Sequence, residues 1–111
     1  MKRFFSLAEL QAERAASSKR YLEFLRVPAL STGIYVLPKQ GVDQQTPHQQ
    51  DEVYYVISGR GRMKITRDDQ APEDRLVVGG TVIFVEAGME HRFHSIEEEL
   101  VVLVVFGPSE G

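Results

Sequence analysis

Beyond residue 20 the chain is a succession of short apolar runs, rich in β-branched and aromatic residues, that are separated by Gly, Pro or acidic residues. The runs read YLEFLRV, LSTGIYVLP, EVYYVIS, RMKITR, RLVV, TVIFVE, HRFHSI and LVVLVVF. No stretch after residue 27 keeps a helical period over a useful length. The pattern predicts an all-β domain of about eight strands, folded as a double-sheet jelly roll or a barrel.

Two of these runs, and two of the segments between them, carry more specific expectations. LVVLVVF is apolar throughout, which is typical of a strand covered on both faces, either in the centre of a sandwich or at a dimer interface. YLEFLRV reads as a strand that needs a neighbour, so we expect a homodimer in which residues 21–27 pair across the interface. The glycines at 59–61 predict a hairpin turn, and the acidic residues 97–99 predict a solvated turn.

The N-terminal residues 1–20 predict a short helix. Ser6 with Glu9 three positions later has the form of a capping box, and good helix formers continue to about Ser17. A partly frayed tail is the alternative. Glu9 also interrupts the apolar run after the basic pair, which leaves it shorter than the roughly 7 to 15 residues of a signal peptide. No run approaches the roughly 18 apolar residues of a membrane span, and we expect a cytoplasmic protein with no membrane partner.

Composition narrows the function classes. A chain of 111 residues with 42% hydrophobic residues fits one domain over 1–111, with a barrel at about 30–107. The net charge of −3 gives no reason to expect a nucleic-acid partner. The absence of cysteine excludes disulfides, thiolate metal sites and a cysteine nucleophile.

His48 and Glu52 suggest chemistry because they combine two metal-ligating residue types at close spacing. In one straight strand they would lie about 13 Å apart at about 3.3 Å per residue. A single ion with bonds of about 2.0 to 2.2 Å cannot bridge that distance. A shared ion therefore requires the chain to turn at the polar residues 49–51. Without an ion, the pair is only the polar mouth of a barrel.

A third ligand must come from HRFHSI, which holds the two other histidines. Alternation in a strand places His91, Phe93 and Ser95 on one face and His94 on the other. Only one of the two histidines is then expected at a common ion. We take His91, with Phe93 as an apolar wall of a pocket, and we expect His94 at the surface or an interface.

Tyr54 lies two residues after Glu52, so both point to the same side of the predicted strand. Its hydroxyl can lie near the ion. The simpler interpretation, which we favour, is a core tyrosine whose hydroxyl bonds to the backbone.

Two motifs make the chain resemble a small single-domain cupin. The first family motif is glycine, a spacer, His-x-His, three or four residues, Glu, six residues and glycine. The sequence has three residues between His48 and Glu52 and six between Glu52 and Gly59. The second family motif is glycine, five residues, Pro-x-Gly, two residues and His. It reads GTVIFVEAGMEH from Gly80 to His91, with Glu in place of the proline.

The resemblance implies an all-β double-stranded β-helix, or jelly-roll barrel, with a metal ion inside, to which the capping box adds the short N-terminal helix. It leaves two alignments of the first motif. In the one we prefer, Thr46 holds the place of the first histidine and His48 that of the second, which keeps the His-to-Glu spacing. In the other, His48 comes first and Gln50 second. The implied metal ligands are His48, Glu52 and His91.

Two histidines and one carboxylate with open positions are the arrangement of non-heme Fe(II) oxygenases, and Mn, Zn or Ni also fits such a set. The resemblance therefore indicates a metal-binding cupin. It is compatible with an oxygenase, isomerase or lyase that acts on a small organic molecule. The alternative is a non-catalytic barrel that binds a small ligand, with or without metal. A dimerising scaffold is a weaker third possibility.

Overall fold

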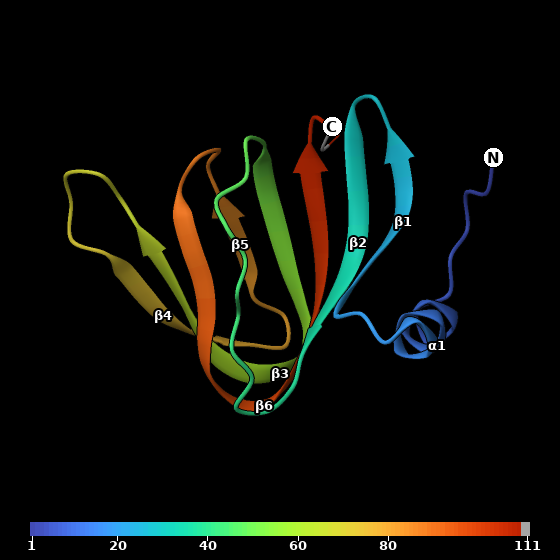
Figure 1. Cartoon of the computed structure of the whole chain (residues 1–111), viewed down its shortest axis with the longest axis horizontal. Coiled ribbons are helices and arrows are strands. Elements are labelled where there is room, and N and C mark those ends of the chain that lie inside the picture. The colour runs from blue at the N-terminus through green and yellow to red at the C-terminus, as the bar shows by residue number, and fades with distance from the viewer. Residues whose placement is uncertain (110–111) are drawn as a thin grey trace.

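The computed structural model describes residues 1–109, which form one helix and six strands (Figure 1). The fold is a mainly antiparallel β structure, as the sequence predicts. In chain order the elements are α1 (Leu7–Ser17), β1 (Tyr21–Val27), β2 (Leu30–Leu37), β3 (Asp51–Thr66), β4 (Glu73–Val78), β5 (Val82–Val85) and β6 (Glu90–Gly107).

The two long strands organise the molecule. The strand order is β1-β2-β6-β3-β4, and β5 also pairs with β3. The first half of β3 pairs with the second half of β6, in a register that sets Glu52 opposite Phe106. The second half of β3 pairs with the first half of β6, with Ile65 opposite His91. Both strands bend at the bottom of Figure 1 and so contribute to both sides of the barrel.

The expectation of about eight strands is wrong because two predicted turns are bends inside continuous strands. EVYYVIS and RMKITR together form β3, and HRFHSI and LVVLVVF together form β6. The register between β3 and β6 shifts at three places from Val56 to Arg62, which marks bulges that curve the pair. The glycines at 59–61 therefore bend a strand and do not close a hairpin. Residues 97–99 are exposed, as predicted, but they belong to β6.

Gly59 makes the bend possible. Its φ of 105° lies in the region that L side chains rarely adopt, and a Cβ atom there would overlap the Glu99 carbonyl oxygen of β6. Gly80, in the turn before β5, has a similar φ of 95° but no heavy atom within 4 Å of the equivalent Cβ position. The two glycines thus share backbone strain and differ in available space.

We expect Gly59→Ala to lower the free energy of unfolding by more than Gly80→Ala does. Backbone strain alone costs about 1 to 3 kcal/mol and acts at both positions, whereas the overlap with Glu99 acts only at position 59. Urea denaturation of the two variants beside the unsubstituted protein measures the difference. Equal losses would show that β3 and β6 do not approach as closely as described at Gly59.

The predicted N-terminal helix is present, and the frayed-tail alternative is wrong. Ser6 is the N-cap of α1, and the Glu9 backbone N–H donates to its Oγ at 3.4 Å. Leu10 from α1 is buried with Ile34, Val36 and Val101, which lie on the outer face of β2 and β6. The helix thus covers the outside of the sheet, beside β1 (Figure 1).

The main core lies inside the barrel and explains the apolar run at the end of the chain. The second half of β6 lies between β2 and β3, with Val102, Val104 and Phe106 facing the inner core and Val101 the outer cluster under α1. This confirms the prediction of a central strand covered on both faces. The edge strand β1 pairs with β2 of its own chain, and its other edge has no strand partner within residues 1–109.

The segment 38–50 between β2 and β3 runs across the space between the two sides of the barrel (Figure 1). Hydrogen bonds fix this segment to the first half of β6. The Gln40 N–H donates to the Ile96 carbonyl at 2.9 Å, and the Phe93 N–H donates to Asp43 Oδ2 at 2.9 Å. The segment is therefore part of the folded barrel. Within residues 1–109, no helix has the length and apolarity to cross a membrane.

Candidate metal centre

The structure brings the three predicted ligands together inside the barrel. Glu52 stands near the start of β3 on one side of the barrel, His91 near the start of β6 on the other, and His48 at the end of the 38–50 segment. Nitrogen or oxygen atoms of the three side chains lie within 4.8 Å of one another. Glu52 and His91 are almost fully buried, and His48 is half-buried. The barrel thus gathers residues that are 43 positions apart in the chain.

The chain turns between His48 and Glu52, as a common site requires. Gln49 and Gln50 form a bend, and β3 starts at Asp51. The Gly88 N–H donates to the His48 carbonyl at 2.7 Å, and the Ala87 N–H donates to Asp51 Oδ1 at 2.9 Å. The turn before β6 is therefore joined to the bend before β3, which fixes the two motifs relative to each other.

His91 presents one ring nitrogen to the site. Its Nδ1 lies 2.9 Å from the Met89 carbonyl oxygen, which only accepts, so Nδ1 carries a hydrogen. Nε2 then faces Glu52 Oε1 at 3.1 Å. Burial opposes the charged ring, but the hydrogen bonds with Glu52 and Met89 and the charge of Glu52 outweigh it and raise the pKa of His91 above its ordinary value.

Tyr54 is a member of the site. Its hydroxyl lies 2.9 Å from His91 Nε2 and donates to Gln45 Oε1 at 3.0 Å. The favoured interpretation of a backbone partner is therefore wrong. Burial, followed by the negative charge of Glu52, raises the pKa of Tyr54 far above its ordinary value. The hydroxyl keeps its proton and acts as a hydrogen-bond donor.

Sequence reasoning missed Gln45 and Asp43, which lie in the 38–50 segment. Gln45 Oε1 is 3.2 Å from His91 Nε2, and Gln45 Nε2 donates to Asp43 Oδ2 at 2.6 Å. Asp43 is buried and also accepts from the Tyr35 hydroxyl at 2.6 Å and from the Phe93 N–H at 2.9 Å. No spacing rule identifies these residues. The only signal is a polar segment directly before the first motif.

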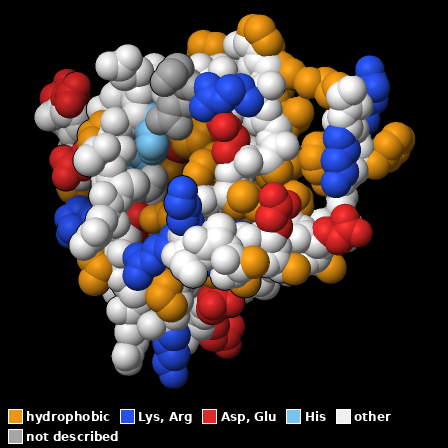
Figure 2. All heavy atoms as spheres, turned by 45° about the vertical axis from the view of Figure 1, so that its right-hand side comes forward, with side chains coloured by type: hydrophobic (Ala, Val, Ile, Leu, Met, Phe, Trp, Pro, Cys, Tyr) orange, Lys and Arg blue, Asp and Glu red, His pale blue; other side chains and the backbone are white. Residues whose placement is uncertain are grey.

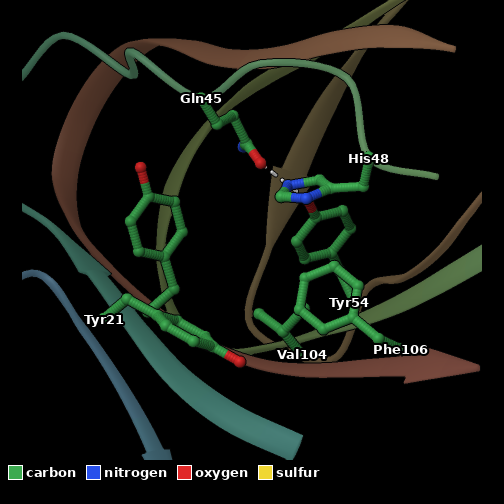
Figure 3. A pocket seen from close by; sticks show the side chains of 7 residues that line it. Tyr21, Gln45, His48, Tyr54, Val104 and Phe106 are labelled. Atoms are coloured by element: carbon green, nitrogen blue, oxygen red, sulfur yellow. Dashed lines mark hydrogen bonds between the residues drawn. The ribbon is translucent and has the colours of Figure 1, made fainter. Parts of the chain in front are cut away.

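A pocket of about 200 Å³ opens beside these residues (Figure 3). Gln45 and His48 reach into it from the 38–50 segment, and Tyr54, Val104 and Phe106 reach into it from the strands (Figure 3). Tyr21 of β1 and Tyr35 of β2 complete the lining. Of the described residues that line the pocket, none is Lys or Arg.

The aromatic wall differs from the prediction. Phe93 is buried and packs against Tyr54 with ring centroids 5.4 Å apart, so it supports the site from behind and does not line the pocket. Phe106 takes the predicted place, and its ring lies 4.9 Å from that of His48. Strand alternation predicted correctly that Phe93 faces the barrel interior. Alternation could not predict that Phe106 lines the pocket, because Phe106 comes from the far end of β6.

His94 points away from the site, as alternation predicts. Its Nε2 lies 2.9 Å from Asp74 Oδ1 on β4, and the side chain is partly exposed. Ser95 departs from the alternation because its φ is 50° and it is exposed, whereas the pattern placed it beside His91. Thr46, which holds the place of the family's first histidine in the preferred alignment, is also exposed.

The residues present fit a divalent metal ion. With Nδ1 protonated, the neutral His91 ring has a lone pair on Nε2, and this faces two oxygens that only accept hydrogen bonds, Glu52 Oε1 and Gln45 Oε1. Glu52 Oε2 is buried and has no hydrogen-bond partner among residues 1–109. A positive charge, either a proton on His91 or a metal cation, would satisfy these lone pairs.

The face shown in Figure 2 has no large area of a single charge sign. Lys and Arg side chains alternate there with Asp and Glu and with uncharged groups. This is an ordinary mixed surface. No charged patch on this face competes with the interior cluster as a candidate site.

Comparison with known proteins agrees with this geometry. The cupin-domain family matches residues 33–106. An uncharacterised protein of Streptomyces coelicolor is 48% identical over 106 residues, which are 96% of each chain.

Three solved structures are similar in fold. A Bacillus halodurans protein matches with a TM-score of 0.73 and 18% identity, over 96% of this chain and 82% of its own. Bacillus subtilis oxalate decarboxylase, studied for its Mn(II) centres, matches with a TM-score of 0.68 and 19% identity, over 79% of this chain and 27% of its own. The Fe(II) form of HppE with an alternative substrate has a TM-score of 0.64 and 21% identity, over 78% of this chain and 48% of its own. The family match spans both motifs and the barrel, and the chain belongs to the cupin family.

Proposed function

We propose that this cupin binds one divalent metal ion through His48, Glu52 and His91 and acts on a small organic molecule in the adjoining pocket. The observation that carries the proposal is the convergence of these three side chains, whose ligand atoms lie within 4.8 Å of one another, with His48 also lining an aromatic pocket. Metal-containing neighbours with Fe(II) or Mn(II) in the same fold support it. Fe, Mn, Zn and Ni all suit two imidazoles and one carboxylate.

Each residue has a defined part in this proposal. Glu52 supplies the negative charge, and the Met89 carbonyl holds the His91 ring so that Nε2 points inward. Tyr54 remains protonated and donates a hydrogen bond at the pocket wall. The chemistry that a divalent ion supplies here when bound is Lewis-acid polarisation of a substrate oxygen or, for iron, activation of O₂. An oxygenase, an isomerase and a lyase are all consistent with these parts.

The pocket favours a compact substrate with an apolar body. Its volume of about 200 Å³ is below the usual range for drug-sized ligands. Most of its lining is aromatic or aliphatic, and the described lining residues offer no Lys or Arg to pair with a second anionic group. We therefore propose a molecule that presents oxygen to the ion and packs its remainder against Phe106 and Val104.

A non-catalytic ligand-binding barrel is the second candidate, and one observation favours it. Among the described residues that line the pocket, the only histidine is His48, which the proposal already uses as a metal ligand, and none is Asp, Glu or Lys. Tyr54 cannot act as a base because its pKa is raised. The pocket thus offers no separate acid–base group for proton transfer.

Metal content and turnover test the proposal together. Protein purified without chelator or affinity metal should contain close to one equivalent of a transition metal by elemental analysis. The metal-loaded form should then consume O₂, or convert members of a panel of small carbonyl and hydroxy compounds, and the chelator-stripped form should not. Metal without turnover would favour the non-catalytic barrel. A protein that neither carries nor takes up metal would refute the proposed site.

A homodimer and a cytoplasmic location complete the proposal. The free edge of β1 can pair with its counterpart in a second copy, and exposed apolar residues on β3 and β5, including Val53, Tyr55 and Phe84, add to the surface that favours association. We expect sedimentation to show a dimer at roughly 50 μM, where association with a micromolar Kd is nearly complete. A monomer at that concentration would refute the dimer. The location rests on the sequence expectation alone.

A further inference from the structure

We propose that the side-chain oxygen of Gln45 is a fourth metal ligand, in place of the histidine that this chain lacks. The inference rests on the proposed metal site and completes it as a set of two imidazoles, one carboxylate and one amide oxygen. Neither motif includes Gln45, since it lies one residue before Thr46. The contacts of its amide group carry the argument.

The distances fit ligands of a common ion. Two ligands bonded at about 2.1 Å, and separated by the angle between neighbours in an octahedron or a tetrahedron, lie about 3.0 to 3.4 Å apart. Gln45 Oε1 lies 3.2 Å from His91 Nε2, and Glu52 Oε1 lies 3.1 Å from the same nitrogen. Both oxygens therefore stand where neighbours of the His91 nitrogen stand in a coordination shell.

The orientation of the amide is fixed from outside the site. Asp43 is a carboxylate that only accepts, so its 2.6 Å contact must be with the NH₂ end of the Gln45 amide. The oxygen end then faces His91 and Tyr54. Asp43 is itself buried and held by the Phe93 N–H of β6 and the hydroxyl of Tyr35. The Gln45 oxygen is therefore held toward the His91 nitrogen before any ion binds.

Tyr54 is a poorer fourth ligand than Gln45. Its hydroxyl hydrogen is directed to Gln45 Oε1 at 3.0 Å, so the phenol takes part in the cluster as a hydrogen-bond donor. A carbonyl-type oxygen has two lone pairs, so Gln45 can accept from Tyr54 and still offer one to an ion. Asp43 and Tyr54 are thus positioning residues: Asp43 holds the NH₂ end of the Gln45 amide, and Tyr54 holds its oxygen end.

The departure at Thr46 is consistent with this exchange. Thr46 is exposed, whereas Gln45 is half-buried and lines the pocket beside His48. The 38–50 segment therefore turns the residue before Thr46 toward His91. In the proposal, the Gln45 oxygen takes the place of the histidine that position 46 does not supply.

The test compares Gln45→Met, Gln45→His and the control Gln44→Met, each loaded with Co²⁺. Methionine keeps the length and removes the oxygen, histidine replaces it with a nitrogen donor, and Gln44 is exposed. Co²⁺ affinity is measured by competition with a chelator, and the visible spectrum of the bound Co²⁺ reports its ligands. We expect Gln45→Met to weaken binding at least about tenfold and to alter the spectrum. Gln45→His should restore affinity with bands displaced toward those of a nitrogen ligand, and Gln44→Met should change neither.

Two results would overturn the inference while leaving the proposed function intact. One is unsubstituted protein that binds Co²⁺ together with a Gln45→Met variant of unchanged affinity and spectrum. The other is weakened binding in both Gln45 variants with a spectrum identical to that of the unsubstituted complex, since this would assign Gln45 a merely structural part. Unsubstituted protein that binds no Co²⁺ at all would overturn the proposed metal site and the inference with it.

Discussion

Replacing His91 or His48 with Ala should abolish near-stoichiometric metal binding. Each substitution removes one of the two imidazoles, which are the strongest neutral donors of the proposed set, and leaves a single nitrogen ligand beside oxygen ligands. His91→Ala should have the larger effect, because His91 Nε2 is the atom around which Glu52 and Gln45 gather at 3.1 and 3.2 Å. Metal content by elemental analysis, after equilibration with one equivalent of Mn²⁺ or Fe²⁺, measures the loss.

Glu52→Gln should weaken binding without distorting the barrel, since it keeps the shape of the side chain and removes the only anionic group of the predicted set. The metal affinity should fall by a factor of about 100 or more. Loss of a residue that only hydrogen-bonds to a metal ligand costs about 10- to 100-fold, and loss of a ligand should cost at least as much. The variant also separates charge from packing. A Glu52→Gln protein with unchanged metal affinity would show that the carboxylate is not a ligand.

His94→Ala is the matched control for His91→Ala. Both residues lie on β6, but His94 faces outward to Asp74 with its Nε2 2.9 Å from the carboxylate. Thr46→Ala is a second control, because the side chain is exposed. Both variants should retain metal. If His94→Ala loses metal as His91→Ala does, the strand register around residue 91 is wrong. If metal survives in all variants, the interior cluster is only a polar barrel mouth.

The sequence was sufficient for the fold class because strand patterns are local. Strand alternation also placed Tyr54 on the same side as Glu52 and turned His94 away from His91. The set of His48, Glu52 and His91 came from the resemblance to the cupin motifs, because no local rule joins residues 43 positions apart. The need for a turn between His48 and Glu52, if they share an ion, followed from bond lengths.

The features that the sequence did not predict depend on contacts between segments that are far apart in the chain. The bend at Gly59 reads locally as a hairpin, and only the carbonyl of Glu99, 40 residues later, shows why a strand continues through it. Asp43 and Gln45 lie in a segment without periodicity, and their roles follow from contacts with Phe93, Tyr35 and His91. Phe106 replaced Phe93 at the pocket for the same reason. Local patterns predicted the faces, and tertiary pairing decided which side chains meet.

Metal affinity should fall steeply as the solution becomes more acidic, because a proton and the ion compete for His91 Nε2. Below the folded-state pKa of His91, binding displaces about one proton, so the affinity should change about tenfold per pH unit. Above that pKa it should level off. The pKa is raised in the folded protein because the hydrogen bonds with Glu52 and Met89 and the charge of Glu52 outweigh burial. The steep region therefore extends above the ordinary value of about 6.5.

The stability of the metal-free protein should show the opposite pH dependence, with a contribution from His91 that decreases as pH rises. Since the folded state holds the His91 proton more tightly than the unfolded chain, the charged ring stabilises the fold below about pH 6.5. That contribution is lost as pH rises through the higher folded-state pKa. Unfolding of chelator-treated protein at a series of pH values measures it, and His91→Gln, which cannot titrate, provides the baseline. The difference between the two should shrink as pH rises. A difference that grows with pH would mean that the cluster holds His91 neutral, and the competition between proton and metal ion would not occur.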